Sequence, residues 1–299
     1  MTIRRRDFGR VAAAAGLAGC SGGLPKPNVV IVQADDLRAT AAGPYNDHAV
    51  ATPNLDRLAA AGTLYEHCYT PHPLCCPARV SLWTGQYSSM HGSRHNQKPM
   101  SDGTPNMAAS FREAGYRLGI FGKNHCFTSG QLRQWFESDC SIGSAAWKAA
   151  LSPATRTRME ERSKWLREQG GALLPPAAAP FSHEIYGTHL ATERAIEFLD
   201  RKHERPFLLW LSLPDPHTPI EVPEKFANAL PANALKMPPF QRDEMDGKNT
   251  RMRIFDYLIR GREIPDEYLA RYLSIYSGKT AFVDYELVSS CISSGTTVC

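Results

Sequence analysis

The segment PHPLCCPARVSLWTG, residues 71–85, places two adjacent cysteines, Cys75 and Cys76, before Pro77 and Arg79. Cysteines in such a position could form half of a disulfide, bind a metal or act as a reactive group. The eight cysteines of the chain follow no regular spacing and form no Cys-x-x-Cys pair, so neither a disulfide scaffold nor a zinc ribbon is expected. The spacing leaves open one disulfide, formed within the set Cys68, Cys126 and Cys140.

Three further groups of polar residues follow apolar runs, and their side chains could bind ions or transfer protons. They are Asp35-Asp36, Lys123-Asn124-His125 and Asp215-Pro216-His217. Carboxylates are hard oxygen ligands that suit calcium or magnesium. Adjacent strand residues point to opposite faces, so Asp35 and Asp36 can reach one ion only where the strand has already ended in a loop. Taken alone, the pair fits a solvated strand end or a helix cap equally well.

The apolar runs predict the strands that must hold these groups. The β-branched run NVVIVQADD, residues 28–36, predicts a buried strand. A helix is predicted over residues 52–62, with Thr52 as its N-cap, Pro53 at its first position and Gly62 as its stop.

Two more helix and strand pairs follow along the chain. The second has another Thr-Pro helix start at residues 104–105, a stop at Gly115 and a strand near 117–121, and the third ends in the strand PFLLWLSL. This alternation predicts an α/β fold with a site at the carboxyl ends of its strands. Long excursions around that site are expected over residues 141–182 and 221–268.

The stretch CCPAR satisfies the pattern Cys-x-Pro-x-Arg, with Cys75 first and Arg79 fifth. Together with VSLWTG it resembles the maturation motif of the type I sulfatases, in which the first cysteine is oxidised to formylglycine. Four other segments resemble sulfatase segments in family order: NVVIVQADD, TPNLDRLAAAGTLYEHCY, GYRLGIFGKNH and PDPHTP. The resemblance extends from Asn28 to about Leu287. It implies an alkaline-phosphatase-like, mostly parallel sheet flanked by helices.

The resemblance also implies a nucleophile and a metal site. Cys75 would be the precursor of the nucleophile and, once modified, a metal ligand, while Arg79 would hold its hydrate. Asp35 and Asp36 would bind calcium, with magnesium as the alternative. One hydroxyl of the hydrated formylglycine would attack sulfur and expel the alcohol, and the second would then eject sulfate.

The remaining site residues implied by the resemblance face the sulfate group. Lys123 would pair with a sulfate oxygen as a point charge. His125 would contact the hydrate and help to deprotonate it, and His217 would assist the leaving oxygen as a general acid. The implied partners are a sulfate-ester substrate and the enzyme that generates formylglycine. Cys76 is expected to be a small buried filler.

Near its end the sequence departs from the sulfatase pattern. After YLSIYSGKTAFVDYEL, which resembles the helix before the last catalytic strand, it changes to VSSCISSGTTVC. The pattern requires a further strand with Asp-Asn-Gly or Asp-His-Gly, a further lysine and a small C-terminal antiparallel domain. We therefore expect residues 28–288 to form a truncated N-terminal α/β domain with weak or no activity, and residues 289–299 to be an aberrant tail.

The first twenty residues resemble a bacterial twin-arginine (Tat) lipoprotein signal that ends at Cys20, and residues 21–27 form a linker. The implied protein is exported, periplasmic or on the cell surface, and anchored to the membrane by a lipid on Cys20. Four arginines and one aspartate within the signal account for most of the formal charge of +4. Nucleic-acid binding is therefore not expected.

Two other functions remain open. The same superfamily scaffold hydrolyses phosphonates and phosphodiesters, with formylglycine or threonine as nucleophile on a similar metal site. The chain could also be an inactive gene fragment or a non-catalytic surface lipoprotein that keeps an anion pocket formed by Arg79, Lys123 and His217, because anion binding demands less exact geometry than catalysis.

Overall fold

The computed structural model describes residues 26–46, 48–170, 175–237, 247–259 and 263–292. Its centre is a four-stranded sheet with the order β1-β5-β2-β3, in which every neighbouring pair is parallel. The strands are β1 (Val29–Asp35), β2 (Arg117–Gly122), β3 (Ser138–Ser141) and β5 (Phe207–Pro216). The predicted α/β fold with a parallel sheet is therefore confirmed. The expected signal, the lipidated Cys20 and residues 293–299 lie outside the described residues.

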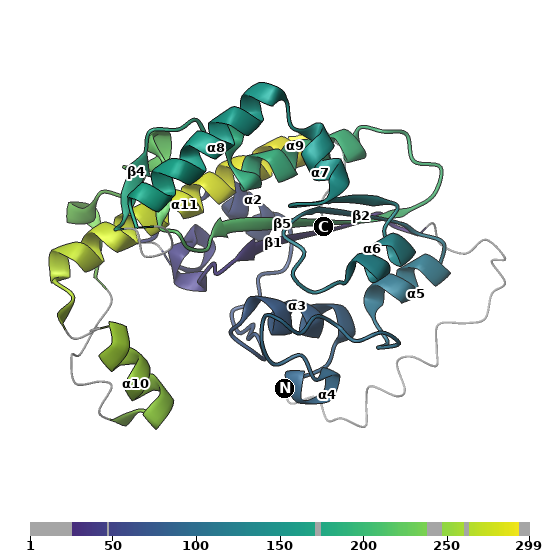
Figure 1. The fold of residues 1–299 in the computed structure, drawn as a ribbon, viewed down its shortest axis with the longest axis horizontal. Helices are drawn as coiled ribbons and strands as arrows, with labels where there is room; N and C mark the ends of the chain where they lie inside the picture. The colour runs from purple at the N-terminus through teal and green to yellow at the C-terminus, as the bar shows by residue number, and fades with distance from the viewer. Residues whose placement is uncertain (1–25, 47, 171–174, 238–246, 260–262, 293–299) are drawn as a thin grey trace, which may run out of the picture.

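Helices cover both faces of this sheet (Figure 1). One face carries α3 (Cys75–Thr84), α4 (Ser88–His91), α5 (Met107–Glu113) and α6 (Ser129–Trp135). The other carries α2 (Pro53–Ala61), α7 (Ala145–Ala150), α8 (Pro153–Glu168), α9 (Gly187–Leu199) and α11 (Asp266–Ile292). The helix α10 (Thr250–Ile259) stands away from the sheet. The long excursions predicted around the site thus contain α7, α8 and α10.

Short elements complete the described chain. A second, two-stranded parallel sheet joins β4 (Ala177–Ala179) to β6 (Glu221–Pro223). The single turns of 3₁₀ helix are η1 (Ala39–Ala41), η2 (Gly43–Tyr45), η4 (His183–Ile185), η5 (Glu224–Phe226) and η6 (Ala232–Ala234). Among the described residues no helix is long and apolar enough to cross a membrane.

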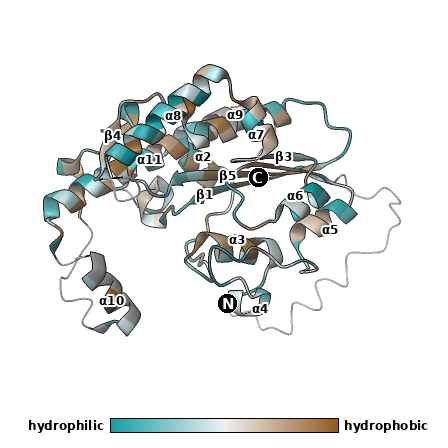
Figure 2. Cartoon of the chain, viewed as in Figure 1, coloured by the Kyte–Doolittle hydropathy of each residue, from teal (hydrophilic) through white to brown (hydrophobic). Residues whose placement is uncertain are grey.

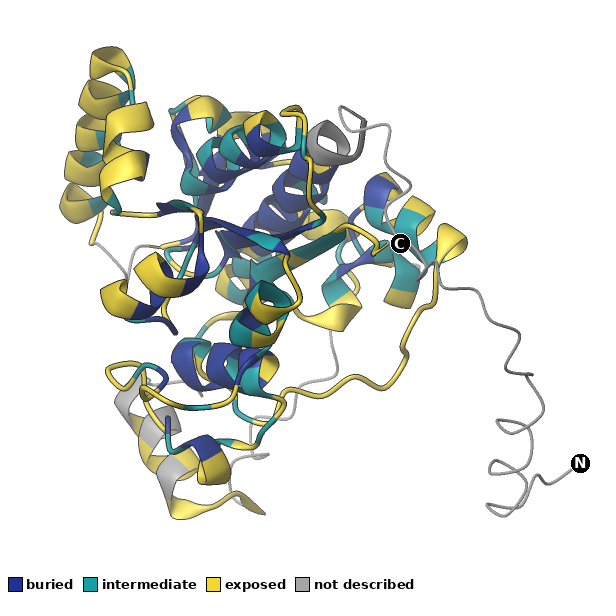
Figure 3. Cartoon of the chain, turned by 90° about the vertical axis from the view of Figure 1, so that its right-hand side faces the viewer, coloured by how far each residue is buried: buried dark blue, intermediate teal, exposed yellow. Residues whose placement is uncertain are grey.

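The central strand β5 is apolar along most of its length because both of its faces are covered. Leu208 and Trp210 pack into the core under α3, while Leu209 and Leu211 pack on the opposite side against α9 and α11. The strands β2 and β5 are buried along almost their whole length, whereas β1 is mostly half-buried (Figure 2 and Figure 3). Successive side chains of a strand point to opposite faces of the sheet, so the single apolar run of β5 contributes to two cores, one on each face.

The five cysteines whose side chains the structure describes form no disulfide. Cys68, Cys126 and Cys140, which the sequence left open as partners, are all free, and so are Cys75 and Cys76. Cys126 is fully buried and packs in the core under α3. Its thiol therefore behaves as a small apolar group.

The N-terminus of α2 is capped from a distance. The helix α2 begins and ends as predicted, with Thr52 at the N-cap position, Pro53 first and Gly62 as the C-cap, but the Thr52 hydroxyl does not cap the helix and accepts instead from the Gly43 N–H at 2.8 Å. The carboxylate of Asp284, on α11, accepts from the Leu55 N–H at 2.8 Å and from the Asn54 N–H at 3.1 Å. The free N–H groups at the start of α2 therefore bind a carboxylate that is 230 residues away in the sequence, and not a local side chain.

The second predicted helix start is wrong by two residues. The helix α5 begins at Met107, not at the Thr-Pro pair of residues 104–105. Asn106 is its N-cap, and its Oδ1 accepts from the Ala109 N–H at 3.0 Å. Asparagine at this position is a better cap than threonine two residues earlier, because its short amide reaches the third N–H of the helix.

We expect Asp284→Ala to lower the free energy of unfolding by about 2–3 kcal/mol, because it leaves buried N–H groups of α2 without a partner. The matched control is Asp56→Ala, which removes an exposed carboxylate from the first turn of the same helix and should cost less than about 1 kcal/mol. Urea unfolding measures both. Equal losses would show that Asp284 does not cap α2.

Candidate active site

The ends of three strands and the start of one helix bring the predicted site residues together. Asp35 is the last residue of β1, Lys123 follows β2, and His217 follows β5. Cys75 is the first residue of α3. Because the strands are parallel, their carboxyl ends meet at one edge of the sheet. One ligand atom from each of Asp35, Cys75 and His217 lies within 4.8 Å of the others.

Lys123 lies between the carboxylate and the thiol. Its ammonium is in direct contact with Asp35 Oδ2 and lies 3.5 Å from Cys75 Sγ. The thiol lies 3.6 Å from Asp35 Oδ2. The centre of the site is therefore a carboxylate, an ammonium group and a sulfur atom in mutual contact.

Arg79 lies one helical turn after Cys75 and is only 1% exposed. Its Nη2 is 3.8 Å from Asp35 Oδ1, and its guanidinium lies 5.5 Å from the centre of the Trp210 ring. Burial lowers the pKa of Arg79 and the charge of Asp35 opposes the shift, but a guanidinium stays protonated in proteins. Its Nη1 donates to three oxygens, those of the Gln33 amide, the Lys123 backbone and the Ser212 hydroxyl.

Two donors of this guanidinium remain free for another group. Within the described residues, Nε and Nη2 of Arg79 are buried and have no hydrogen-bond partner. An unpaired buried donor is costly, because it has lost water without gaining an acceptor. A group that carries more acceptor oxygens than a thiol would satisfy these donors.

The backbone around Lys123 is fixed by a close approach of β2 to β5. Gly122 has φ 95°, and a Cβ on it would lie 2.1 Å from the Ser212 carbonyl oxygen. The Lys123 N–H donates to that same oxygen at 2.7 Å. Only glycine fits this position, so the start of the loop is held rigidly against the neighbouring strand.

The loop then turns back through Asn124 and His125. Asn124 Oδ1 accepts from the Phe127 N–H at 3.0 Å, and its Nδ2 donates to the Phe127 carbonyl at 2.7 Å. His125 takes the left-handed conformation with φ 62°, which is uncommon for a residue other than glycine. Sequence reasoning assigned no role to Asn124. An asparagine after a strand is a turn signal that could have indicated one.

These surroundings favour the charged form of the Cys75 thiol. Hydrogen bonds from His125 and then from His217 lower its pKa from 9.0 to about 6, and burial and the charge of Asp35 oppose the shift. The N-terminus of α3 also favours a negative charge at this position. Cys76 differs, because burial raises its pKa and its Sγ lies 3.2 Å from the Lys98 carbonyl. Its predicted role as a buried filler agrees with these contacts.

His217 is held by its own loop. Its Nδ1 lies 2.9 Å from the Thr218 carbonyl, which can only accept, so Nδ1 carries the proton. The hydrogen bond to Cys75 raises the pKa of His217, the Thr218 carbonyl adds to this shift, and burial opposes it. The other ring nitrogen is left for the centre of the site.

The helix α11 supports the site from the opposite side. Lys279, 2% exposed, donates to the His217 and Pro219 carbonyls at 2.7 Å each and pairs with Asp215 at 3.0 Å. The Tyr276 hydroxyl donates to the Asp36 carbonyl at 2.7 Å. Sequence reasoning missed both residues. A lysine among apolar residues of a helix could have indicated a buried, paired charge.

Asp36 lies apart from the other predicted ligands. Its side chain is exposed, its φ is 66°, and it is not among the ligand atoms grouped around Cys75. The left-handed turn shows that β1 ends between Asp35 and Asp36, as a shared ion would require. In the present arrangement, however, only the first carboxylate is directed into the group.

The carboxylate oxygens of Asp35 are the type of ligand that calcium prefers, but the described residues offer too few oxygen ligands for a calcium ion. Calcium takes about 6 to 8 oxygen ligands, and the described residues offer one inward carboxylate and a second beside it. The ammonium of Lys123 already contacts the inward carboxylate. The remaining oxygens of a calcium shell would have to come from water, from an oxidised Cys75 or from residues outside those described.

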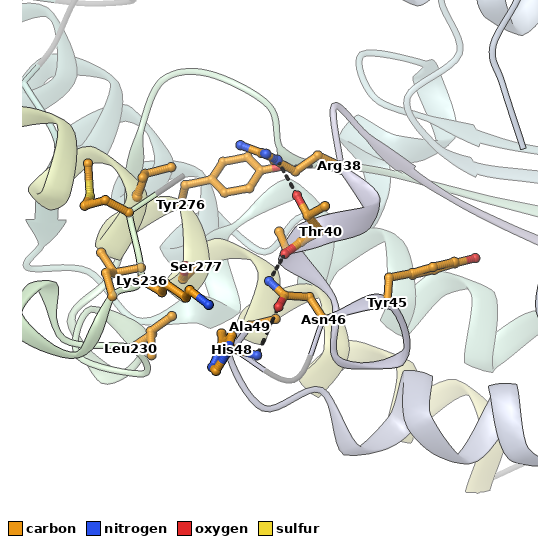
Figure 4. Close-up of a pocket in the computed structure, with 14 residues that line it drawn as sticks. Arg38, Thr40, Tyr45, Asn46, His48, Ala49, Leu230, Lys236, Tyr276 and Ser277 are labelled. Carbon is orange, nitrogen blue, oxygen red and sulfur yellow. Dashed lines mark hydrogen bonds between the residues drawn. The ribbon is translucent and has the colours of Figure 1, made fainter. Parts of the chain in front are cut away.

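A separate cavity of about 420 Å³ lies beside the loop that follows β1 (Figure 4). Its basic groups are Arg38, His48 and Lys236. Arg38 Nε donates to the Thr40 hydroxyl at 2.8 Å, and the Asn46 amide donates to the Thr40 carbonyl at 2.8 Å. None of the side chains around Cys75 lines this cavity, so the cavity is not the catalytic centre.

Comparison with known proteins identifies relatives along most of the chain. Residues 27–287 match the sequence model of the family described as Sulfatase. The chain is 25% identical to an arylsulfatase of Clostridium perfringens, over 88% of this chain and 58% of that protein. It is 29% identical to the mouse (Mus musculus) N-acetylgalactosamine-6-sulfatase, over 72% of this chain and 44% of that protein. The chain thus spans about half the length of these relatives.

A solved structure shows the same fold. The phosphonate monoester hydrolase of Agrobacterium radiobacter superposes with a TM-score of 0.67 at 22% identity, over 88% of this chain and 58% of that chain. At this identity the likeness concerns the fold alone.

We expect iodoacetamide to alkylate Cys75 with a pH midpoint near 6 in the unmodified protein, because the thiolate is the reacting form. His125→Ala should move the midpoint toward 9.0, since it removes the hydrogen bond that lowers the pKa most. Mass spectrometry of the peptide measures both. Cys76 on the same peptide is the internal control and should stay unmodified. A midpoint that His125→Ala leaves in place would contradict this geometry.

Lys279→Met should lower the free energy of unfolding by about 3–5 kcal/mol, because it leaves Asp215 buried without its partner. It should also raise the alkylation midpoint of Cys75, because His217 loses the lysine that holds its loop. The surface variant Lys164→Met is the control, and it should change stability by less than about 0.5 kcal/mol. Destabilisation without a shifted midpoint would show that Lys279 does not position His217.

Proposed function

The chain belongs to the sulfatase family, and on this basis we propose that the protein hydrolyses sulfate esters with a formylglycine made from Cys75. The observation that carries the proposal is the contact of Lys123 with both Asp35 and Cys75 at the carboxyl edge of the sheet. The cations of Lys123 and Arg79 outnumber the one inward carboxylate. A surplus of positive charge beside the nucleophile suits a sulfate anion.

The sulfatase family generally uses formylglycine and a divalent metal. When present, the hydrated aldehyde supplies a hydroxyl nucleophile, and the cation lowers the pKa of that hydroxyl. We propose calcium as the ion, with magnesium as the alternative. Asp35, Asp36 and the oxidised Cys75 would contribute oxygen ligands, and the limited number of carboxylates among the described residues leaves part of the shell to other donors.

The residues of this chain would bind the substrate and move its protons. The Lys123 ammonium would pair with one sulfate oxygen. The free donors of Arg79 would hold the nucleophile. His217, whose Nδ1 proton is fixed by the Thr218 carbonyl, would give the proton of its other nitrogen to the leaving alcohol, and His125 would accept the proton of the nucleophile.

We also propose export and lipid anchoring. Their support is the sequence of residues 1–20 alone, with its twin arginines and Cys20. Modification of Cys75 would require a formylglycine-generating enzyme in the same host.

The alternatives predict different substrates. A phosphonate or phosphodiester is also tetrahedral and anionic, so the same cations could hold it. A non-catalytic anion-binding protein would use Arg79, Lys123 and His217 without turnover. The choice among them requires a direct comparison of substrates.

The test uses the full chain, produced together with a formylglycine-generating enzyme and assayed in calcium. We expect weak turnover of an aryl sulfate, above that of an aryl phosphonate. Lys123→Met should lower kcat/KM by about 10²–10³-fold, because it removes a positive charge that would stabilise the negative charge of the transition state. The remote, exposed Lys202→Met should not. Preferential phosphonate turnover would replace the proposed substrate, and no turnover despite verified formylglycine would favour the binding protein.

A further inference from the structure

A second group of metal-binding side chains lies outside the catalytic site. It consists of His183 on η4, His189 on α9 and Glu286 on α11. One ligand atom from each lies within 4.8 Å of the others. The Nδ1 atom of His189 is 3.0 Å from Glu286 Oε1, and the rings of His183 and His189 have centres 5.1 Å apart. Two imidazoles and one carboxylate therefore converge on one point.

Glu286 shows that this group is incomplete. The residue is 1% exposed, and within the described residues its Oε2 is buried without a hydrogen-bond partner. A buried carboxylate oxygen without a partner is costly, and native structures contain few of them. The hydrogen bond to His189 uses only Oε1. A further positive group is therefore expected beside Oε2.

The nearby charged side chains do not supply it. The ammonium of Lys225 lies over the Tyr285 ring at 4.0 Å and over the Phe226 ring at 5.2 Å. No ion pair between Lys225 and Glu286 occurs in the described part of the chain.

A simple ion pair between His189 and Glu286 explains only part of this arrangement. It leaves Oε2 unsatisfied and gives His183 no role. The ring of His183 is instead held edge-on by aromatic neighbours, with ring centres at 5.5 Å for Tyr285 and 6.2 Å for Phe282. The packing directs both imidazoles to the carboxylate.

We propose that His183, His189 and Glu286 bind a divalent transition-metal ion, with zinc as the best fit. Two nitrogens and one carboxylate oxygen form a three-residue zinc set, in which solvent takes the fourth position. The half-buried histidines leave access for that ligand. Zinc bonds of about 2.0–2.2 Å require only a small closure of the three side chains.

Such an ion would have a structural effect. Helices α9 and α11 lie side by side on the same face of the sheet (Figure 1). The metal would tie η4 and α9 to α11, the helix that carries Tyr276 and Lys279. Binding would therefore stabilise the fold, because the unfolded chain does not present the three ligands together.

The experiment uses the full chain with Cys75→Ser, since the group around Cys75 could also bind zinc. The protein is freed of metal with a chelator and titrated with zinc chloride, and the stoichiometry and melting temperature are measured. We expect one zinc per chain and a higher melting temperature. Adding His183→Gln or Glu286→Gln removes a direct ligand, so zinc binding should weaken by more than the roughly 10–100-fold that is typical when a residue that only supports a metal ligand is lost. The rise in melting temperature should disappear.

The matched control adds His95→Gln, an exposed histidine outside the group, and should bind zinc like the parent. Near-ultraviolet circular dichroism checks that each variant is folded. Glu286→Gln preserves shape, and if it does not fold, the half-buried His183 carries the test. Absence of zinc binding by the Cys75→Ser protein, or equal binding by His183→Gln and His95→Gln, would overturn the proposal.

Discussion

The buried carboxylate of Asp35, in contact with Lys123 and close to Arg79, is the interaction on which the rest of the site depends. Arg79 is almost fully buried, and a buried charge is tolerated only with a nearby countercharge and satisfied hydrogen bonds. Asp35 provides the countercharge, and oxygens from β1, β5 and the loop after β2 accept from Nη1 of the guanidinium, while Nε and Nη2 have no hydrogen-bond partner among the described residues. Two cations share one inward carboxylate beside Cys75, so a surplus of positive charge remains wherever Cys75 is uncharged, as a protonated thiol or as an aldehyde hydrate, and this surplus creates a place for an anion.

The helix α11 supports this arrangement through contacts that are distant in sequence. Tyr276 holds the backbone after β1, Lys279 holds the loop of His217, and Asp284 caps α2. Each of these side chains is polar and faces the interior, where it satisfies backbone groups that would otherwise be unpaired. The same helix also carries Glu286 of the second histidine group. The geometry of the catalytic edge therefore depends on a helix on the far side of the sheet.

The sequence predicted those features that depend on local patterns. Apolar runs predicted the strands, and the resemblance of CCPAR to the sulfatase motif placed Cys75 and Arg79 in one site. The helix α3, on which these two residues lie one turn apart near Asp35, was not predicted. Prediction failed where a distant residue competes with a local one: Thr52 is at the predicted N-cap position of α2, but the N–H groups there bind Asp284 and not the Thr52 hydroxyl. Lys279 was missed because its role depends on tertiary contacts alone. The roles of the site residues in catalysis and the position of Asp36 around an ion remain predictions.

The most direct measurement of the anion site is protection of Cys75 by sulfate. Iodoacetamide alkylation of the Cys75 peptide is followed by mass spectrometry below pH 6, where most of the thiol is uncharged. The rates are compared in sodium sulfate and in sodium chloride at equal ionic strength, for the parent protein and for Lys123→Met. The arrangement of Asp35, Arg79 and Lys123 predicts that sulfate slows alkylation in the parent and not in the variant. An equal rate in both salts, or equal protection in both proteins, would contradict an anion site at Cys75.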